Sequence, residues 1–281
     1  MLVNTIEILK DAQRGKYAVA AFNVYNLETV QAAIHVAEQE NQPVIIALGE
    51  RYFPTVDVEG FAALVKAMAE KTSIPVALHL DHAYEKESII RAIRCGFTSV
   101  MFDGSAYALE ENVRRTKEIV EIAHMAGVSV EAEIGSLAKG EFSDEEEGTG
   151  TLTDPKAAKE FVEATGVDFL AAAIGTVHGM YKGEPKIDLP LLEKIGQAVD
   201  VPLVLHGGSG TPESVIKQAI DLGICKVNVN TEVSMAAVSF IQNYFETKQM
   251  VHLSTIMADM QQAMEPVMTK FVRVFANKEN Q

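Results

Sequence analysis

Short apolar runs alternate with amphipathic segments along almost the whole chain. The amphipathic stretches, such as LETVQAAIHVAEQE, carry apolar residues at the spacing of a helix that covers a core. The apolar runs have the length of buried strands and lie at residues 17–24, 42–49, 74–81, 98–105, 129–135, 169–176, 202–209 and 224–231. Near-continuous apolar strands that alternate with helices indicate a parallel sheet covered by helices. Eight such units in 281 residues predict an α/β fold, a single (β/α)8 TIM barrel with an N-terminal helix and a C-terminal helical extension.

The connections favour one catalytic domain over residues 1–281. The segments AGVSV, TGVDF and LGICK each place a glycine after a helix and before a strand, where a left-handed cap is expected. One stretch differs from the other connections: residues 136–152, SLAKGEFSDEEEGTGTL, are long, acidic and glycine-containing. Such a stretch is either a solvated loop or a lid over the active site, and we predict a mobile active-site loop.

Charge and composition exclude several classes of function. A formal net charge of −15 argues against a nucleic-acid partner, because phosphate backbones require a basic face. No apolar run approaches the roughly 20 residues that span a bilayer, and charged residues interrupt the N-terminal segment, which is unlike a signal peptide. The two cysteines, Cys95 and Cys225, lie in apolar segments and are expected to be reduced. These features predict a cytoplasmic protein that acts on a small molecule.

Polar residues gather where the predicted strands end, which is where barrels of this type place their catalytic groups. Three of the seven histidines, His82, His178 and His206, lie there, together with the carboxylates Asp103 and Glu133. Three histidines that leave one coordination position open are a catalytic zinc arrangement, although cobalt or another divalent ion also suits them. The remaining histidines are expected to be structural or solvent-exposed: His35, His79, His124 and His252.

The segments LHGGSG and NVNTE follow the last two predicted strands. In barrels of this type, loop amides and a helix N-terminus at that place commonly bind a phosphate. Glycines at 207, 208 and 210 allow the backbone to approach a ligand closely. The sequence therefore predicts an anion site beside His206.

The chain resembles the class II ketose-bisphosphate aldolases, which include fructose- and tagatose-bisphosphate aldolases. The resemblance rests on AFNVYNLE, LHLDHA, SVMFDGS, VEAEIG, GTVHGMYKGEP, LVLHGGSG and CKVNVNTE, which extend along nearly the whole chain. It implies a zinc-dependent lyase that reversibly cleaves a ketose 1-phosphate into dihydroxyacetone phosphate and a three-carbon aldehyde. It also implies a homodimer or homotetramer, and in some relatives a monovalent cation, Na⁺ or K⁺, near the phosphate.

The resemblance also assigns roles to individual residues. His82, His178 and His206 would be the zinc ligands, and Asp103 and Glu133 would hold a second or displaced ion. Asp81 would transfer the proton of the C4 hydroxyl, and Glu141, eight residues after Glu133, would be the loop glutamate that moves the carbon-bound proton. The expected substrate-binding residues are Asn23, Gly179, Lys182, Gly207, Gly208, Ser209, Asn228, Val229, Asn230 and Thr231.

Three segments that concern the far end of the substrate depart from the family pattern. After the second strand, where relatives often carry a serine or threonine, the chain has Gly49 followed by Glu50 and Arg51, and Gln261 stands at the position of an arginine of the C-terminal helix. The loop reads AKGEFS, where a double glycine followed by two acids is frequent. Either Arg51 compensates and the substrate is a bisphosphate, or the C6 group is not a phosphate. A neutral glutamine would suit a sulfonate, as in 6-deoxy-6-sulfofructose 1-phosphate, or a polar uncharged end. The sequence does not distinguish the fructose from the tagatose configuration at C4.

Two other classes of function compete with this interpretation. A metal-dependent hydrolase on the same fold usually shows His-x-His at the end of the first strand, where this chain has FNV. A non-catalytic or partner-dependent aldolase-like subunit is the other alternative. The intact histidines, Asp81 and Glu141 argue against an inactive protein, whereas a need for a partner stays open.

Overall fold

The fold is a closed parallel barrel, as predicted. The computed structural model describes residues 1–145, 148–247 and 251–277. Within these residues eight strands close in the order β1-β10-β9-β7-β5-β4-β3-β2, and every neighbouring pair is parallel. They are β1 (Val19–Asn23), β2 (Val44–Gly49), β3 (Val76–Ala83), β4 (Ser99–Phe102), β5 (Ser129–Ile134), β7 (Phe169–Ala172), β9 (Leu203–Leu205) and β10 (Ile224–Val229). Each strand overlaps one of the apolar runs; several are shorter than the run, whereas β3 extends past residue 81 to Ala83.

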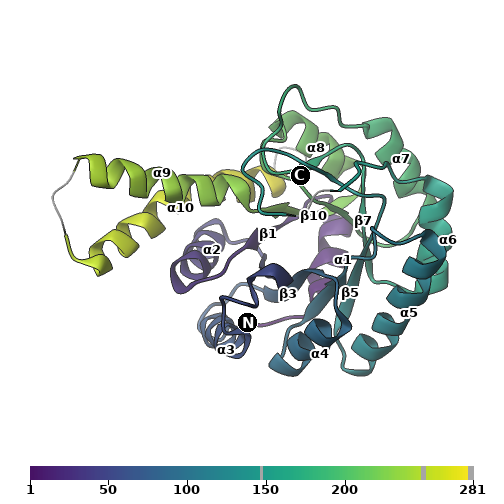
Figure 1. Cartoon of the computed structure of the whole chain (residues 1–281), viewed down its shortest axis with the longest axis horizontal. Coiled ribbons are helices and arrows are strands. Elements are labelled where there is room, and N and C mark those ends of the chain that lie inside the picture. Colours follow the sequence, from purple (N-terminus) through teal and green to yellow (C-terminus); the bar gives the residue numbers. More distant parts are fainter. Residues whose placement is uncertain (146–147, 248–250, 278–281) are drawn as a thin grey trace.

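A ring of helices surrounds the barrel, and two long helices project from one side of it (Figure 1). The helices are α1 (Thr5–Gly15), α2 (Leu27–Glu40), α3 (Val58–Ala69), α4 (Lys86–Cys95), α5 (Leu109–Met125), α6 (Pro155–Thr165), α7 (Leu189–Ala198), α8 (Glu213–Asp221), α9 (Thr231–Thr247) and α10 (Leu253–Phe275), with a short 3₁₀ helix, η1, at Glu50–Tyr52. The projecting pair is α9 and α10, and α10 also packs against α2. Among the described residues, no helix combines the length and the apolar composition that spanning a membrane requires.

Local sequence signals set the ends of these helices. Asn26 accepts a hydrogen bond from the backbone N–H of Thr29, and the Thr29 hydroxyl accepts one from the backbone of Asn26, which forms a capping box at the start of α2. Asp154 caps α6 with a single hydrogen bond, which its side chain accepts from the backbone N–H of Ala157, and proline occupies the first helical position. Gly166 ends α6 with φ of 71°, the left-handed cap that TGVDF predicts.

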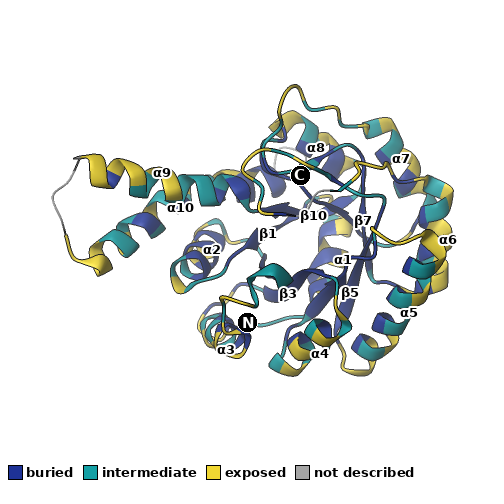
Figure 2. Cartoon of the chain, in the orientation of Figure 1, coloured by how far each residue is buried: buried dark blue, intermediate teal, exposed yellow. Residues whose placement is uncertain are grey.

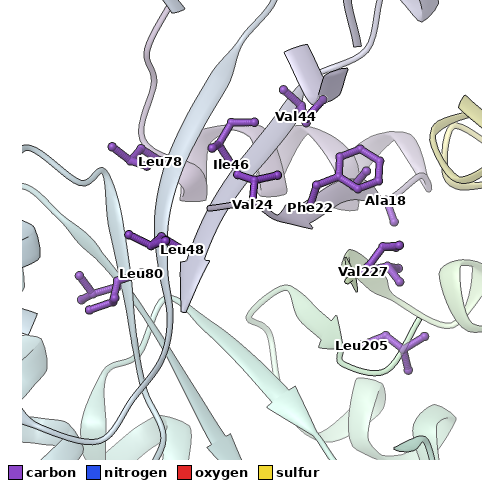
Figure 3. Packing of buried hydrophobic residues seen from close by; sticks show 14 of the residues in the cluster. Ala18, Phe22, Val24, Val44, Ile46, Leu48, Leu78, Leu80, Leu205 and Val227 are labelled. Carbon is purple, nitrogen blue, oxygen red and sulfur yellow. The ribbon is translucent and has the colours of Figure 1, made fainter. Parts of the chain in front are cut away.

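Alternation along the strands separates two kinds of packing. On β2, Val44, Ile46 and Leu48 face outward and pack in the large core between barrel and helices; Figure 3 shows them beside outward residues of neighbouring strands. Inward-facing residues change in character along the barrel axis, because the entry ends of the strands are apolar and the exit ends are polar. On β3 this inward series is Ala77, His79 and Asp81. Figure 2 shows the barrel strands coloured mostly as buried, whereas the surrounding helices alternate between buried and exposed residues.

Helix α1 closes the entry end of the barrel. Its residues Ile8, Leu9 and Ala12 are buried against inward-facing apolar side chains of the strands, among them Phe169. Because α1 covers this end of the barrel, the polar groups inside the barrel are accessible to water only from the exit end.

We expect Leu9→Ala to lower the free energy of unfolding by about 2–5 kcal/mol, because it leaves a cavity under a fully buried side chain. Urea unfolding would measure the change, with Lys10→Ala on the exposed face of α1 as the control. Since Leu9 lies at the end of the barrel opposite the polar residues, the catalytic rate of the folded variant should stay within about twofold of the parent. A loss of stability equal to that of the control would contradict the role of α1 as a plug.

Candidate metal and substrate site

Three histidines converge at the exit end of the barrel. His82 lies near the end of β3, His206 directly follows β9, and His178 belongs to β8 (Val177–His178). One ring nitrogen of each histidine lies within 4.8 Å of those of the other two, and Nε2 of His82 is 2.7 Å from Nδ1 of His206. The rings of His82 and His178 meet edge to face, with their centroids 4.9 Å apart.

An irregularity in β3 allows two consecutive residues to face the site. The pairing of β3 with β4 shifts between Leu80 and Ala83, and His82 has a positive φ of 41°. In a regular strand Asp81 and His82 would point to opposite faces, whereas this bulge turns both into the barrel mouth. A non-glycine residue at positive φ is strained, and such strain gathers at functional sites.

His178 was predicted to follow the sixth apolar run directly, and it lies instead in a short additional strand beyond β7. β7 ends at Ala172, before the end of the predicted run 169–176, and the chain then forms β8. β8 pairs with β6 (Ala138–Lys139) of the loop after β5, a small sheet that the sequence did not predict. The loop at 136–152 therefore contacts the segment that carries one of the histidines.

Carboxylates fix the orientation of two of the three rings. Nδ1 of His82 is 2.8 Å from Oδ2 of Asp103, and Nε2 of His206 is 2.8 Å from Oε1 of Glu131. With these nitrogens donating to carboxylates, Nε2 of His82 and Nδ1 of His206 are left as acceptors that face each other. Nε2 of His178 is buried and, among the described residues, has no hydrogen-bond partner. These three nitrogens suit a divalent metal ion.

Asp103 and Glu133 form a second group with His82, with ligand atoms within 4.8 Å of one another. Burial raises the pKa of Glu133 well above its ordinary value, and the negative charge of Asp103 adds to this effect. Oε2 of Glu133 has no hydrogen-bond partner among the described residues. The unpaired oxygen of Glu133 beside the histidines could contact a cation, whose charge would favour the ionised carboxylate.

A buried network below the histidines was not predicted from the sequence. Nζ of Lys226 lies 2.8 Å from Oε2 of Glu131, and both side chains are fully buried. Burial would raise the pKa of Glu131, but Lys226 and the hydrogen bond from His206 lower it to about 2. His79, expected to be structural or exposed, is a buried member of this network, with Nε2 3.4 Å from Oε2 of Glu131. The alternation of side chains along a strand could have indicated this network. His79, Glu131 and Lys226 each lie two residues before a predicted site residue, and residues two apart in a strand face the same side.

Asp81 is held by two asparagines. Nδ2 of Asn23 donates to its Oδ2 at 2.6 Å, and Nδ2 of Asn228 donates to its Oδ1 at 3.0 Å. Burial alone would raise the pKa of Asp81, but the neighbouring His82 and Lys226 hold it well below its ordinary range. The carboxylate of Asp81 is therefore ionised, and its orientation is fixed beside His82, one of the three converging histidines.

Most predicted substrate-binding residues line one cavity above Asp81. Together with the three histidines, the cavity is bordered by Asn23, Gly179, Gly207, Gly208, Ser209, Asn228, Asn230 and Thr231. Gly207 has φ of 73°, and a Cβ there would lie 2.2 Å from the carbonyl oxygen of Val177, so only glycine fits. Helix α9 begins at Thr231, so that its N-terminal N–H groups open at this edge of the cavity.

Other predicted residues lie elsewhere. Val229 is buried in the outer core, Lys182 is exposed outside the described cavities, and Glu141 is exposed on the loop, paired through its backbone with Met180. Gln261 is on α10, where Nε2 donates to Oε1 of Glu265 at 3.2 Å, outside the described cavities. Gly49 ends β2 in register with Asp81.

Arg51 of η1 forms an ion pair with Glu145 of the loop. Asp144 and Glu145, together with Ser143, border the same cavity as Asp81 and His82. The acidic loop was predicted from the sequence, but a role for Asp144 and Glu145 was not.

Comparisons with known proteins agree with this geometry. A sequence model of the family "Fructose-bisphosphate aldolase class-II" matches residues 3–280. The Bacillus subtilis (strain 168) protein named "Probable fructose-bisphosphate aldolase" is 46% identical over 255 residues, which are 88% of this chain and 87% of that protein.

Two crystal structures share the fold over almost their whole length. The YdjI aldolase of Escherichia coli K12 has a TM-score of 0.88 and 37% identity, with 98% of this chain and 97% of that chain covered. A Coccidioides immitis protein provisionally named a fructose-1,6-bisphosphate aldolase has a TM-score of 0.90 and 32% identity, with 98% and 96% covered. The chain belongs to the class II fructose-bisphosphate aldolase family, and it is a class II aldolase, a carbon–carbon lyase of a family whose members in general depend on zinc.

Proposed function

We propose that this aldolase reversibly cleaves a ketose 1-phosphate into dihydroxyacetone phosphate and a three-carbon aldehyde. The observation that carries the proposal is the placement of Asp81, fixed by Asn23 and Asn228, beside three converging histidines and a glycine-lined cavity. This arrangement would supply a metal site, a positioned carboxylate and an anion site within one barrel mouth. The proposed substrate is a ketose 1,6-bisphosphate of the fructose or tagatose type.

His82, His178 and His206 would hold the zinc ion. The facing nitrogens of His82 and His206 are acceptors, because Asp103 and Glu131 accept the opposite N–H groups. Three histidines leave a fourth coordination position open, as in catalytic zinc sites, whereas structural zinc sites have four protein ligands. When bound, zinc would act as a Lewis acid that stabilises negative charge beside the C2 carbonyl of the substrate. Asp103 and Glu133 would accommodate a second or displaced position of the ion.

Asp81 would accept the proton of the C4 hydroxyl as the carbon–carbon bond breaks. The two asparagine amides direct its oxygens, and the low pKa keeps it in the base form. The fragment that retains the phosphate then carries negative charge and must be protonated at carbon. Glu141 would supply that proton, which requires the loop at 136–152 to move, since Glu141 faces solvent in this structure.

The phosphate of the dihydroxyacetone half would lie against Gly207, Gly208, Ser209, Asn230 and Thr231. These residues combine backbone N–H groups, a hydroxyl and a helix N-terminus, which together bind anions without many cations. A Na⁺ or K⁺ ion near this phosphate, a homodimeric or homotetrameric assembly and a cytoplasmic location are further parts of the proposal, supported by the family membership.

Family membership does not define which chemical group the site binds at the far (C6) end of the substrate. Arg51 borders the site through its partners on the loop, whereas Gln261 hydrogen-bonds Glu265 of its own helix. Within one chain this favours Arg51 as the residue that recognises the distal group, and hence an anionic group. A sulfonate, as in 6-deoxy-6-sulfofructose 1-phosphate, is the alternative to a phosphate.

Asp81→Ala should reduce kcat roughly 10²–10⁴-fold, the usual effect of removing a general base. Zinc content, measured by mass spectrometry on the same preparation, should stay at the parent value because Asp81 is not among the converging ligand groups. A rate near that of the parent with full zinc would end the proposed role of Asp81.

Glu131→Gln should weaken zinc binding about 10–100-fold, because it alters the hydrogen bond that orients His206. Competition with a chelator of known affinity would measure the change, with Glu121→Gln on the exposed face of α5 as the control. Unchanged zinc affinity, with the fold intact by circular dichroism, would show that Glu131 serves only packing.

Dihydroxyacetone phosphate release should be abolished by chelator and should occur with at least one of three substrates. These are fructose 1,6-bisphosphate, tagatose 1,6-bisphosphate and 6-deoxy-6-sulfofructose 1-phosphate. Preference for a bisphosphate would support the main proposal, and preference for the sulfonated sugar would support the alternative. Release from none of them by the purified chain would contradict the proposed substrate class.

A further inference from the structure

Strand β3 continues beyond the end of its neighbour β2. The two strands pair residue by residue from Val44 onward, and Gly49 and Asp81 are the last residues in this pairing. β2 ends at Gly49, whereas β3 runs on to Ala83. The part of β3 that extends past β2 includes His82 with its positive φ of 41°. A backbone in this conformation needs support from contacts other than the β2 ladder.

A side chain provides such a contact where β2 ends. Glu50 directly follows Gly49, and its Oε2 accepts a hydrogen bond from the backbone N–H of Tyr84 at 2.7 Å. The side chain is half-buried, so that the bond is partly shielded from water. A hydrogen bond to a carboxylate is stronger than one between two neutral groups. Glu50 therefore holds the chain just after the bulge of β3.

Strand β4 holds the same bulge from the opposite edge of β3. The backbone N–H of Asp103 donates to the carbonyl oxygen of Ala83 at 2.8 Å, and the pairing with β4 resumes at Ala83 after its shift. With β4 on one edge and Glu50 on the other, Asp81 and His82 lie immediately before a stretch of backbone that is fixed on both sides. A strained conformation persists only where the surrounding structure holds it in this way.

The segment that carries Glu50 is itself well anchored. The backbone N–H of Phe53 donates to the carbonyl oxygen of Glu50 at 2.9 Å, which closes the turn of η1. The ring of Tyr52 packs against that of Tyr25, with their centroids 5.1 Å apart, and Phe53 and Val56 pack against the large core. Because η1 is held by these contacts, the carboxylate of Glu50 can fix the backbone of β3.

We propose that Glu50 is a positioning residue for the metal site and for the base. By accepting the N–H of Tyr84 it maintains the bulge that turns both Asp81 and His82 into the barrel mouth. The role is indirect, because among the described residues Glu50 belongs neither to the converging ligand groups nor to the lining of the cavity above Asp81. The inference rests on the proposed function for the roles of Asp81 and His82, and it adds to that function a residue that acts through the backbone.

Three substitutions separate the reach of this side chain from its charge. Glu50→Gln removes the negative charge but keeps a carbonyl oxygen at the same distance, which can accept the N–H of Tyr84. Glu50→Asp keeps the charge but is one methylene shorter, so that the carboxylate no longer reaches this N–H in the present backbone. Glu50→Ala removes both properties. A role through the hydrogen bond predicts that the Gln variant is closest to the parent, whereas a role through charge predicts that the Asp variant is closest.

Zinc affinity reports the placement of His82 without any turnover. Glu50→Ala and Glu50→Asp should weaken zinc binding about tenfold or more, and Glu50→Gln should stay within about threefold of the parent, because outer contacts that orient a metal ligand have effects of this size. Competition with a chelator of known affinity would measure the change. Glu38→Ala removes a carboxylate from an exposed position on α2 and is the control. Urea unfolding of the zinc-free variants measures any change in stability separately.

Kinetics with fructose 1,6-bisphosphate at saturating zinc report the placement of Asp81. Glu50→Ala and Glu50→Asp should lower kcat about 10–100-fold, since a small displacement of a catalytic group has an effect of this size. KM should change much less, because the proposed phosphate contacts lie on β9, β10 and the segments that follow them. Glu50→Gln should recover most of the parent kcat. Circular dichroism of the same preparations verifies that a lower kcat is not a loss of folded protein.

The outcomes distinguish this inference from the proposed function. If all three variants match Glu38→Ala in zinc affinity and kcat, or if the Asp variant retains both better than the Gln variant, the positioning role is refuted and the proposed function is unaffected. If the parent cleaves no ketose phosphate while zinc affinity follows the expected order, the positioning of His82 by Glu50 stands and the proposed function fails.

Discussion

The buried carboxylate of Glu131 is the group on which the arrangement of the site depends. A fully buried negative charge is stable only when it is paired and hydrogen-bonded, and Lys226 and His206 provide both from the neighbouring part of the barrel. The same two contacts that stabilise the charge also fix the ring of His206. His79 fills the remaining side of the carboxylate and connects it, through Ser99, to Thr5 of α1. The orientation of His206 is thereby linked, through these contacts, to α1, the helix that closes the entry end of the barrel.

The sequence was sufficient for the barrel because the fold depends on repeated, local patterns. Each apolar run is near-continuous since parallel strands are buried on both faces, and each intervening segment has one apolar face. Because functional residues of such barrels lie at the carboxyl ends of the strands, His82 and His206 are expected to lie together, although they are 124 residues apart in the chain. The polar interior was harder to predict. Lys226 and Glu131 lie on different strands, and the sequence does not show that they pair with each other across the barrel.

Irregular backbone sets the limit of prediction from the sequence. Alternation predicts that Asp81 and His82 face opposite sides, and only the bulge with its positive φ brings both inward. The small sheet of β6 and β8, which positions His178, has two residues in each strand and no periodic signal. Gln261 could be aligned with a family arginine, but its contact with Glu265 depends on the packing of α10 against α2. The assignment of a distal group therefore required contacts that are non-local in the sequence.

The acidity of the chain shapes how it can recognise an anion. With a net charge of −15, positive potential at the barrel mouth must come from few sources, among them the N-terminus of α9, Lys226 and Arg51. An unpaired guanidinium that is mostly buried would be costly, and the loop acids remove that cost by remaining paired with it. The segment after β2 and the loop after β5 are therefore held together by charge pairing at the barrel mouth.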